Sequence, residues 1–487
     1  MGDPLNPLDK TLQDMFSCEP QTATYLGLHE YDFLYPELGC EWMSKCLDTL
    51  ELDLSELSSW EEEKLELDIQ EAVRSLKVMQ ITTGFWRYWK SYPIAPGLIS
   101  EMLISTILRN APEDFKKKAL EARIKAIPRM LENSKEMLSK PKKVWVQLAR
   151  AELNGLKLML LDMNAPNDVL ESLAEYDKWL DSLEPEEGFE PIGETLFEEL
   201  LRIRGIVETP SSLASWARSE ARKLKEELGE EPQGKEVENA KDVYLEAVKR
   251  AKNFVIEKKV APLALDEELE AIDTPKPLIP TIPYAAYFPP APFEWRNLGY
   301  LSVTPGAAKR EYYDILNTAV HETYPGHHLQ LSLHLPTRYR PIVANATDLI
   351  EGWAHYTEEL MMELGFETNP RYVWQVKKDM LWRLVRVYVD VELSTGKMSF
   401  EEAVKELVEV AMLDENSAKA EVLRYTLSPG YQLSYAYGKR RIKEMREEVK
   451  EYLGSKFSLY EFHKTLLKEG SLPVDVLRKL ILEEVQK

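Results

Sequence analysis

Apolar residues recur at intervals of three and four along most of this chain, and this spacing constrains the fold more than any other feature of the sequence. Two segments show it clearly: Ala119, Ile124, Ile127, Met130 and Leu131 in the first, and Leu153, Leu156, Leu158 and Leu161 in the second. Residues spaced in this way share one face of an α-helix, whereas a strand would alternate at every second residue. The chain is therefore predicted to be mainly α.

One segment interrupts the helical pattern. Between Thr274 and Pro305 the sequence becomes rich in proline and aromatic residues, which is too rigid for a long helix, and Gly299–Thr304 reads as a short extended segment. We therefore expect a boundary near residue 270. Residues 1–270 would form an N-terminal helical lobe, and residues 271–487 a second helical lobe that holds the chemistry.

The composition excludes several classes of protein. Hydrophobic residues make up 44% of the 487 residues, which supports a large buried core and excludes disorder as the main state. The net charge of −22 repels nucleic acid and anionic lipid. No stretch approaches the roughly 20 apolar residues of a membrane helix. Neither nucleic acid nor a membrane is an expected partner.

The cysteines and the first residues predict a cytoplasmic protein. Met1–Lys10 contains two acidic residues and lacks the apolar stretch of a secretory leader. Cys18, Cys40 and Cys46 are an odd number in a chain large enough to fold without cross-links, so no disulfide framework is expected. Abundant Glu and Lys with few Gln are typical of a heat-adapted, thermophilic host.

Five of the seven histidines lie within 35 residues, whereas chance would spread them: His321, His327, His328, His334 and His355. Neutral imidazole is the commonest nitrogen ligand of zinc in proteins. Glu322 directly follows His321, where a carboxylate can take a proton from a zinc-activated water. The cluster predicts a zinc site with Glu322 as general base. His334 lacks a comparable context and is expected to be a packing or surface residue.

The spacing of these histidines requires a distorted helix. On a regular helix His327 would point away from His321, and His328 would lie about 10.5 Å further along the axis, although zinc–nitrogen bonds are only about 2.1 Å long. Pro325 lacks the N–H that would reach the His321 carbonyl, and Gly326 is permissive, so the helix should bulge or break there. This favours His327 as the second ligand, with His328 as the alternative. A simpler reading is that Pro-Gly separates two helices and the histidines bind nothing.

A third ligand is predicted from the next helix. Asp348 can cap a helix that extends to about Leu364, and Glu351 and His355 lie four residues apart on one of its faces. Glu351 is the predicted carboxylate ligand, because catalytic zinc commonly takes two histidines and one carboxylate. His355 would either support a ligand or contact the substrate.

Hydrolysis also needs a donor for the developing oxyanion. Several tyrosines lie between Arg424 and Gly438, but spacing selects none of them, and core packing is the simpler expectation for each. Arg383, Arg386 and Asp390 are expected to form a charge network along one helix rather than a substrate clamp.

Taken together, these motifs resemble the family known as domain of unknown function 885, a group of large, mainly helical proteins similar to zinc metallopeptidases. His321–Gln330 matches its HExxPGH motif with the following His-Leu-Gln, and Glu351–Tyr356 matches its EGWA-x-Y motif. Weaker matches are Ala23–His29, Tyr300–Thr304 and the signature within Arg424–Gly438.

The resemblance implies a gluzincin-like arrangement in a deep central cleft between two helical lobes. His321, His327 and Glu351 would bind zinc, and Glu322 would act as general base. It also raises Tyr435 above the other tyrosines as a transition-state donor. The small extended segment would lie beside the metal-binding helix.

We therefore expect a zinc-dependent hydrolase, most simply a peptidase of the oligopeptidase or carboxypeptidase type that cleaves short peptides. One alternative is a metal-dependent hydrolase or lyase acting on a non-peptide substrate, such as a small amide. The other is a non-enzymatic helical binding protein whose metal is structural.

Overall fold

The computed structural model describes residues 6–60, 66–279, 282, 284–305 and 310–485. Its contacts divide the chain into two compact units. Unit 1 comprises Met1–Glu190, Pro275–Thr281 and Ala291–Arg296, and unit 2 comprises Pro191–Thr274, Ile282–Pro290 and Asn297–Lys487. Residues 191–270, which the sequence analysis placed in the first lobe, thus belong to unit 2. They do so because α11 (Pro210–Leu228) packs along α17 (Pro370–Ser394), and α12 (Ala240–Lys258) packs against α13 (Tyr312–Glu322).

Unit 1 is built from helices. They are α1 (Pro7–Cys18), α2 (Pro20–Tyr25), η1 (His29–Tyr31), α3 (Cys40–Ser59), α4 (Glu66–Thr82), α5 (Gly84–Arg87), α6 (Ala95–Leu108), α7 (Glu113–Met137), α8 (Lys143–Asp162), α9 (Asn167–Asp181) and the short η3 (Lys276–Leu278). The apolar face predicted for α7 is buried. On α8, Leu153 and Leu156 are buried but Leu158 and Leu161 are exposed, and Met159 and Leu160 complete the buried face instead.

A disulfide between Cys18 and Cys46 joins α1 to α3. The expectation of a chain without such bonds is therefore wrong for this pair, and Cys40 is the free cysteine. An odd number of cysteines excludes complete pairing, but it does not exclude one bond between two helices that pack together.

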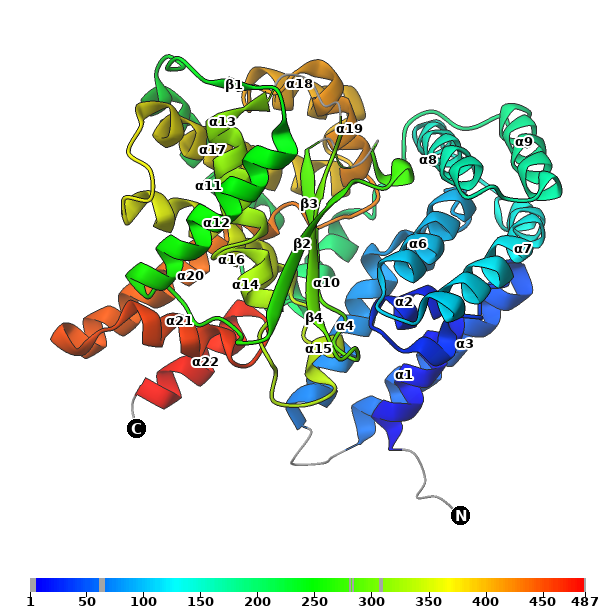
Figure 1. The fold of residues 1–487 in the computed structure, drawn as a ribbon, viewed down its shortest axis with the longest axis horizontal. Coiled ribbons are helices and arrows are strands. Elements are labelled where there is room, and N and C mark those ends of the chain that lie inside the picture. Colours follow the sequence, from blue (N-terminus) through cyan, green and yellow to red (C-terminus); the bar gives the residue numbers. More distant parts are fainter. Residues whose placement is uncertain (1–5, 61–65, 280–281, 283, 306–309, 486–487) are drawn as a thin grey trace. The chain divides into compact units, whose positions relative to one another are not determined.

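Unit 2 contains the remaining helices: α10 (Glu194–Ile203), α11, α12, α13, α14 (His327–Leu331), α15 (Arg340–Val343), α16 (Thr347–Glu363), α17, α18 (Phe400–Glu409), α19 (Glu415–Tyr425), α20 (Ser434–Leu453), η4 (Gly454–Lys456), α21 (Leu459–Leu467) and α22 (Val474–Val485). The prediction of a mainly α protein is confirmed (Figure 1). Among the helices of the described segments, none combines the length and apolar character needed to cross a bilayer.

A three-stranded sheet accompanies these helices in unit 2. Its order is β2 (Glu267–Asp273), β4 (Asn297–Val303) and β3 (Ala285–Phe288). Strand β4 pairs with β2 in parallel, with Glu267 opposite Asn297, and with β3 antiparallel, with Ala285 opposite Val303. Strand β4 confirms the predicted extended segment, while residues 280, 281 and 283 of the proline-rich region lie outside the described residues. A second, two-stranded pairing joins β1 (Glu236–Val237) to β5 (Arg310–Glu311).

Two glycines allow α16 and α20 to cross at close range. A Cβ atom on Gly438 would lie 1.9 Å from the Asp348 carbonyl oxygen and 2.8 Å from the Cα of Gly352. A Cβ atom on Gly352 would in turn lie 2.6 Å from the backbone of Gly438. Only glycine fits at this crossing, which brings the helix that carries Glu351 against the helix that carries Tyr435. Helix α16 also packs against α13, which in turn contacts β3 (Figure 1).

Candidate metal centre

The histidine motif is divided between two helices. Helix α13 ends at Glu322 and α14 begins at His327, with the Tyr324–Pro325 peptide bond cis between them. The Gly326 N–H donates to the Val320 carbonyl at 3.1 Å. A Cβ atom on Gly326 would lie 1.9 Å from the His321 carbonyl oxygen, so the turn needs glycine for its tightness. The predicted distortion is thus a break.

The break brings His321, His327 and Glu351 together. Their ligand atoms all lie within 4.8 Å of one another, and all three side chains are buried. Glu351 Oε2 is 3.3 Å from His327 Nε2 and 3.7 Å from His321 Nε2. Ligands on a tetrahedral zinc with bonds of about 2.1 Å are about 3.4 Å apart, so the group has the right size. Among the described residues Glu351 Oε2 has no hydrogen-bond partner, which leaves it available to a cation.

A second carboxylate orients His321. The Nδ1 atom of His321 lies 2.6 Å from Glu358 Oε1, which leaves Nε2 directed to the metal position. Glu358 also accepts from Asn317 at 2.9 Å, and Asn317 donates to Asp379 at 2.6 Å. Ligating histidines typically donate their other nitrogen to a carboxylate in this way. The sequence analysis missed Glu358, although it follows Glu351 by seven residues and so lies on the same face of α16.

The electrostatics of the group favour a positive charge. Burial would lower the pKa of His321, but Glu351 and Glu358 outweigh it and raise the pKa to about 9. Burial would raise the pKa of Glu351, but His327 and His321 hold it well below the usual range. A pocket that retains a proton on a buried imidazole also suits a metal cation, so the residues present fit a zinc ion.

The other two histidines of the motif region lie outside this group. Both ring nitrogens of the buried His328 have partners, since Nε2 is 2.6 Å from Glu267 and Nδ1 is 2.8 Å from the Tyr287 hydroxyl. His334 is exposed and pairs with Asp266 at 2.9 Å. The geometry therefore joins His327, rather than His328, to His321 and Glu351.

Glu322 is the last residue of α13, next to the first ligand. Burial raises the pKa of its carboxyl and Glu351 adds to the rise, while His321 and His327 oppose it. A buried carboxyl with a raised pKa thus follows the first candidate ligand, and such a group is typical of general acids and bases.

Two tyrosines lie beside the candidate ligands: Tyr431, just before α20, and Tyr435, within it. The Tyr431 hydroxyl donates to Glu351 Oε1. The Tyr435 ring stacks on His321, with centroids 6.1 Å apart and an interplanar angle of 18°. Sequence spacing alone could not distinguish Tyr431 from its neighbours. His355 is only 1% exposed, and its Nδ1 lies 3.5 Å from Glu358 Oε1, the oxygen that His321 also contacts.

Two local expectations are wrong. Asp348 does not cap α16, because it lies inside the helix and forms a buried ion pair with Arg204. Asp390 does not pair with Arg383 or Arg386. It accepts from the backbone N–H groups of Gly430 and Leu433 at 2.8 and 2.9 Å, and thereby anchors the segment that carries Tyr431.

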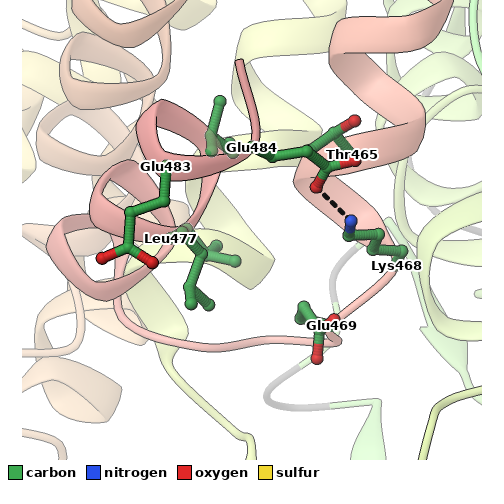
Figure 2. Close-up of a pocket in the computed structure, with 8 residues that line it drawn as sticks. Thr465, Lys468, Glu469, Leu477, Glu483 and Glu484 are labelled. Atoms are coloured by element: carbon green, nitrogen blue, oxygen red, sulfur yellow. Dashed lines mark hydrogen bonds and ion pairs between the residues drawn. The ribbon is translucent and has the colours of Figure 1, made fainter. Parts of the chain in front are cut away.

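A surface pocket in unit 2 shares no residue with the metal centre. Figure 2 shows it between α21 and α22, with an ion pair between Lys468 and Glu484 at its rim. Its remaining lining is formed by Thr465, Glu469, Leu477, Leu480, Ile481 and Glu483.

Two solved structures share the fold over nearly the whole chain. A protein from Colwellia psychrerythraea, provisionally described as a lipoprotein, matches with a TM-score of 0.78 and 18% identity over 99% of this chain and 98% of its own. A protein from Shewanella oneidensis, provisionally described as a lipoprotein of unknown function, matches with a TM-score of 0.74 and 22% identity over 98% and 99%. At such identities the likeness concerns the fold alone.

Other comparisons add little. Trypanosoma cruzi metallocarboxypeptidase 1 matches with 12% identity over 98% of this chain and 92% of its own, but its TM-score of 0.37 is too low to support an argument. No curated protein matches the sequence.

The cytoplasmic location expected from the sequence is contradicted by the description of both full-length structural relatives as lipoproteins. The Cys18–Cys46 bond points the same way, because disulfides persist mainly in oxidising compartments. The composition of Met1–Lys10 and an odd cysteine count were insufficient grounds for that expectation.

The sequence also matches a family, over residues 230–481. This range lies mostly in unit 2 and includes the three candidate ligands, Glu322 and both tyrosines of the site. Because the match spans more than half of the chain, the protein belongs to the family described as "Bacterial protein of unknown function (DUF885)".

Proposed function

We propose that this protein is a zinc-dependent hydrolase that cleaves amide bonds in short peptides. The observation that carries the proposal is the convergence of His321, His327 and Glu351, with Glu322 beside the first ligand. Three protein ligands leave one position of a tetrahedral ion open, as in catalytic zinc sites, whereas structural sites use four. Within the described part of the chain no fourth His, Cys, Asp or Glu joins the group, which supports a catalytic over a structural metal.

His321 and His327 would bind through Nε2, and Glu351 through Oε2. Zinc in such a site supplies a Lewis acid that polarises the substrate carbonyl and lowers the pKa of water. Glu358 keeps Nδ1 of His321 engaged, so the ring cannot turn away from the metal position.

Glu322 is the proposed general base. A buried carboxyl with a raised pKa is suited to accept the proton of the attacking water and then to return that proton to the leaving amine.

Tyr435 is the proposed donor to the developing oxyanion, because its ring lies against His321. Tyr431 donates to Oε1 of Glu351 and thereby orients the carboxylate, whose other oxygen, Oε2, is the proposed ligand. His355 is buried and its Nδ1 lies 3.5 Å from Glu358 Oε1, which fits a supporting role better than contact with the substrate.

The lipoprotein descriptions of the structural relatives and the disulfide in unit 1 lead us to propose a location outside the cytoplasm. Peptides present in that compartment would then be the substrates.

A panel of fluorogenic peptides tests the proposed reaction. The zinc-loaded protein should cleave some of them, and Glu322→Gln should lower kcat by about 10² to 10⁴ while the zinc content stays unchanged. Cleavage of small amides or esters without any peptide turnover would show instead that the substrate is not a peptide. If Glu322→Gln cleaves as fast as the parent protein, the proposed mechanism is wrong.

A further inference from the structure

Two arginines near the metal centre share a single carboxylate. Arg386 and Arg424 both donate to Oε2 of Glu421, at 2.8 and 2.7 Å. The Nε of Arg386 also donates to the Tyr425 hydroxyl at 2.7 Å, but that group is neutral. Two cations and one anion leave an excess positive charge.

The third arginine of the region does not share this excess. Arg383 lies 3.4 Å from Glu358 and 3.5 Å from Asp379, so carboxylates other than Glu421 compensate its charge. The unbalanced charge therefore belongs to Arg386 and Arg424. It is a local exception in a chain of net charge −22.

The pair lies one aromatic ring away from the metal ligands. The Arg386 guanidinium carbon is 4.7 Å from the centroid of Tyr435, the ring that stacks on His321. Burial raises the pKa of Tyr435 to about 12, Glu351 adds to this rise, and Arg386 and Arg424 oppose it. Arg386 thus lies against the ring whose hydroxyl is proposed to meet the reacting carbonyl.

One of the two guanidinium groups is open to a ligand. The Arg424 side chain is 33% exposed, whereas that of Arg386 is 5% exposed and stacks on Trp382 at 4.1 Å. Among the described residues the buried Nε of Arg424 has no hydrogen-bond partner. Arg424 therefore keeps one N–H without a partner, and Arg386, which shares Glu421 with it, adds a second positive charge. Arginine's planar fork is well suited to bind a carboxylate with two hydrogen bonds.

We infer that Arg424, backed by Arg386, binds a carboxylate of the peptide substrate. This inference rests on the proposed function, since it assigns the substrate class of the same site. The carboxylate is either the C-terminal α-carboxylate or the side chain of an acidic residue. Either would neutralise the excess charge and hold a peptide with an amide bond near the metal ligands.

Binding to the full-length Glu322→Gln protein tests the inference without turnover. Calorimetry would compare three capped dipeptides. They are N-acetyl-Ala-Phe with a free α-carboxylate, the same peptide as an α-amide, and N-acetyl-Ala-Glu as an α-amide, which keeps only its side-chain carboxylate. We expect at least one carboxylate peptide to bind about tenfold more tightly than the uncharged amide, or about 1.4 kcal/mol. Which one does so identifies the source.

Arg424→Gln in the same background should remove this preference while amide binding stays unchanged, and Arg424→Lys should retain part of it. Arg218→Gln is the matched control. Arg218, on α11, also pairs with a glutamate, Glu392, and lies over a tyrosine ring, Tyr388, and both of these partners belong to α17. It should keep the full preference, even if a carboxylate also binds the metal.

Equal affinity of the protein for all three peptides would overturn the inference. The same holds if Arg424→Gln prefers a carboxylate peptide over the amide as strongly as Arg218→Gln does. The proposed function is tested separately. If the protein prefers the carboxylate peptides but the parent protein cleaves no peptide, the proposed hydrolase activity is contradicted while the carboxylate-binding site is supported.

Discussion

The carboxylate behind His321 offers a sensitive test of the metal centre. Glu358 is fully buried, and its Oε1 lies 2.6 Å from Nδ1 of His321. Glu358→Gln keeps the size of the side chain but removes the charge and one acceptor. Loss of such a supporting carboxylate commonly costs 10- to 100-fold in metal affinity, or about 1.4 to 2.7 kcal/mol. We place Glu358→Gln toward the upper end, because Arg383 would also lose part of its compensation.

Competition with a chromophoric chelator would measure the zinc affinity of the parent protein and the variant. Glu359→Gln is the matched control, since Glu359 is the next residue of α16 but pairs with Lys439 at 2.7 Å and Lys443 at 2.8 Å instead of a histidine. Its zinc affinity should stay within about twofold of the parent. If both variants bind zinc equally well, Glu358 does not orient His321 and this reading of the site is refuted.

Three further outcomes concern stability. Gly438→Ala should lower the stability of unit 2 by about 3 kcal/mol, because the new Cβ atom would overlap the backbone of α16 where the two helices cross at Gly352. An unchanged melting temperature would contradict that packing. Cys18→Ser, which opens a link spanning 28 residues, should cost about 3 to 4 kcal/mol in denaturant unfolding, whereas Cys40→Ser should be neutral. Burial raises the pKa of the Glu19 carboxyl from 4.5 to about 8 in the folded state. Between pH 4.5 and pH 8 the folded state therefore keeps a proton that the unfolded state releases, and the free energy of unfolding falls as the pH rises. Glu19→Gln should therefore raise the melting temperature at pH 8.5 and have little effect at pH 5; equal shifts at both would contradict the assignment.

The helical character and the short strand were predictable because their signals are local. Apolar spacing reports the buried face of a helix, and Gly299–Thr304 falls almost entirely within β4. Strand β2 was not anticipated because Glu-Glu-Leu-Glu-Ala-Ile-Asp is rich in charge and lacks the usual composition of a strand. Its pairing with β4 is a contact between distant segments, which no local pattern encodes.

The convergence of the three candidate ligands could be predicted because a metal site needs particular residue types at compatible spacing. Pro325 and Gly326 indicated a break, and the break explains how residues six apart can converge. The supporting groups were harder to find. Tyr431 reaches Glu351 only because Asp390 anchors its segment, and neither partner is marked by spacing in the sequence. The arginine pair likewise depends on how α17 and α19 pack.

The most direct test of the central claim is the metal content of the purified protein and two neighbouring alanine variants. We predict about one zinc per chain in the parent, nearly complete loss in His327→Ala, and retention in His328→Ala, whose nitrogens already face Glu267 and Tyr287. A parent protein that takes up no stoichiometric metal, or loss of zinc in His328→Ala but not in His327→Ala, would contradict the account.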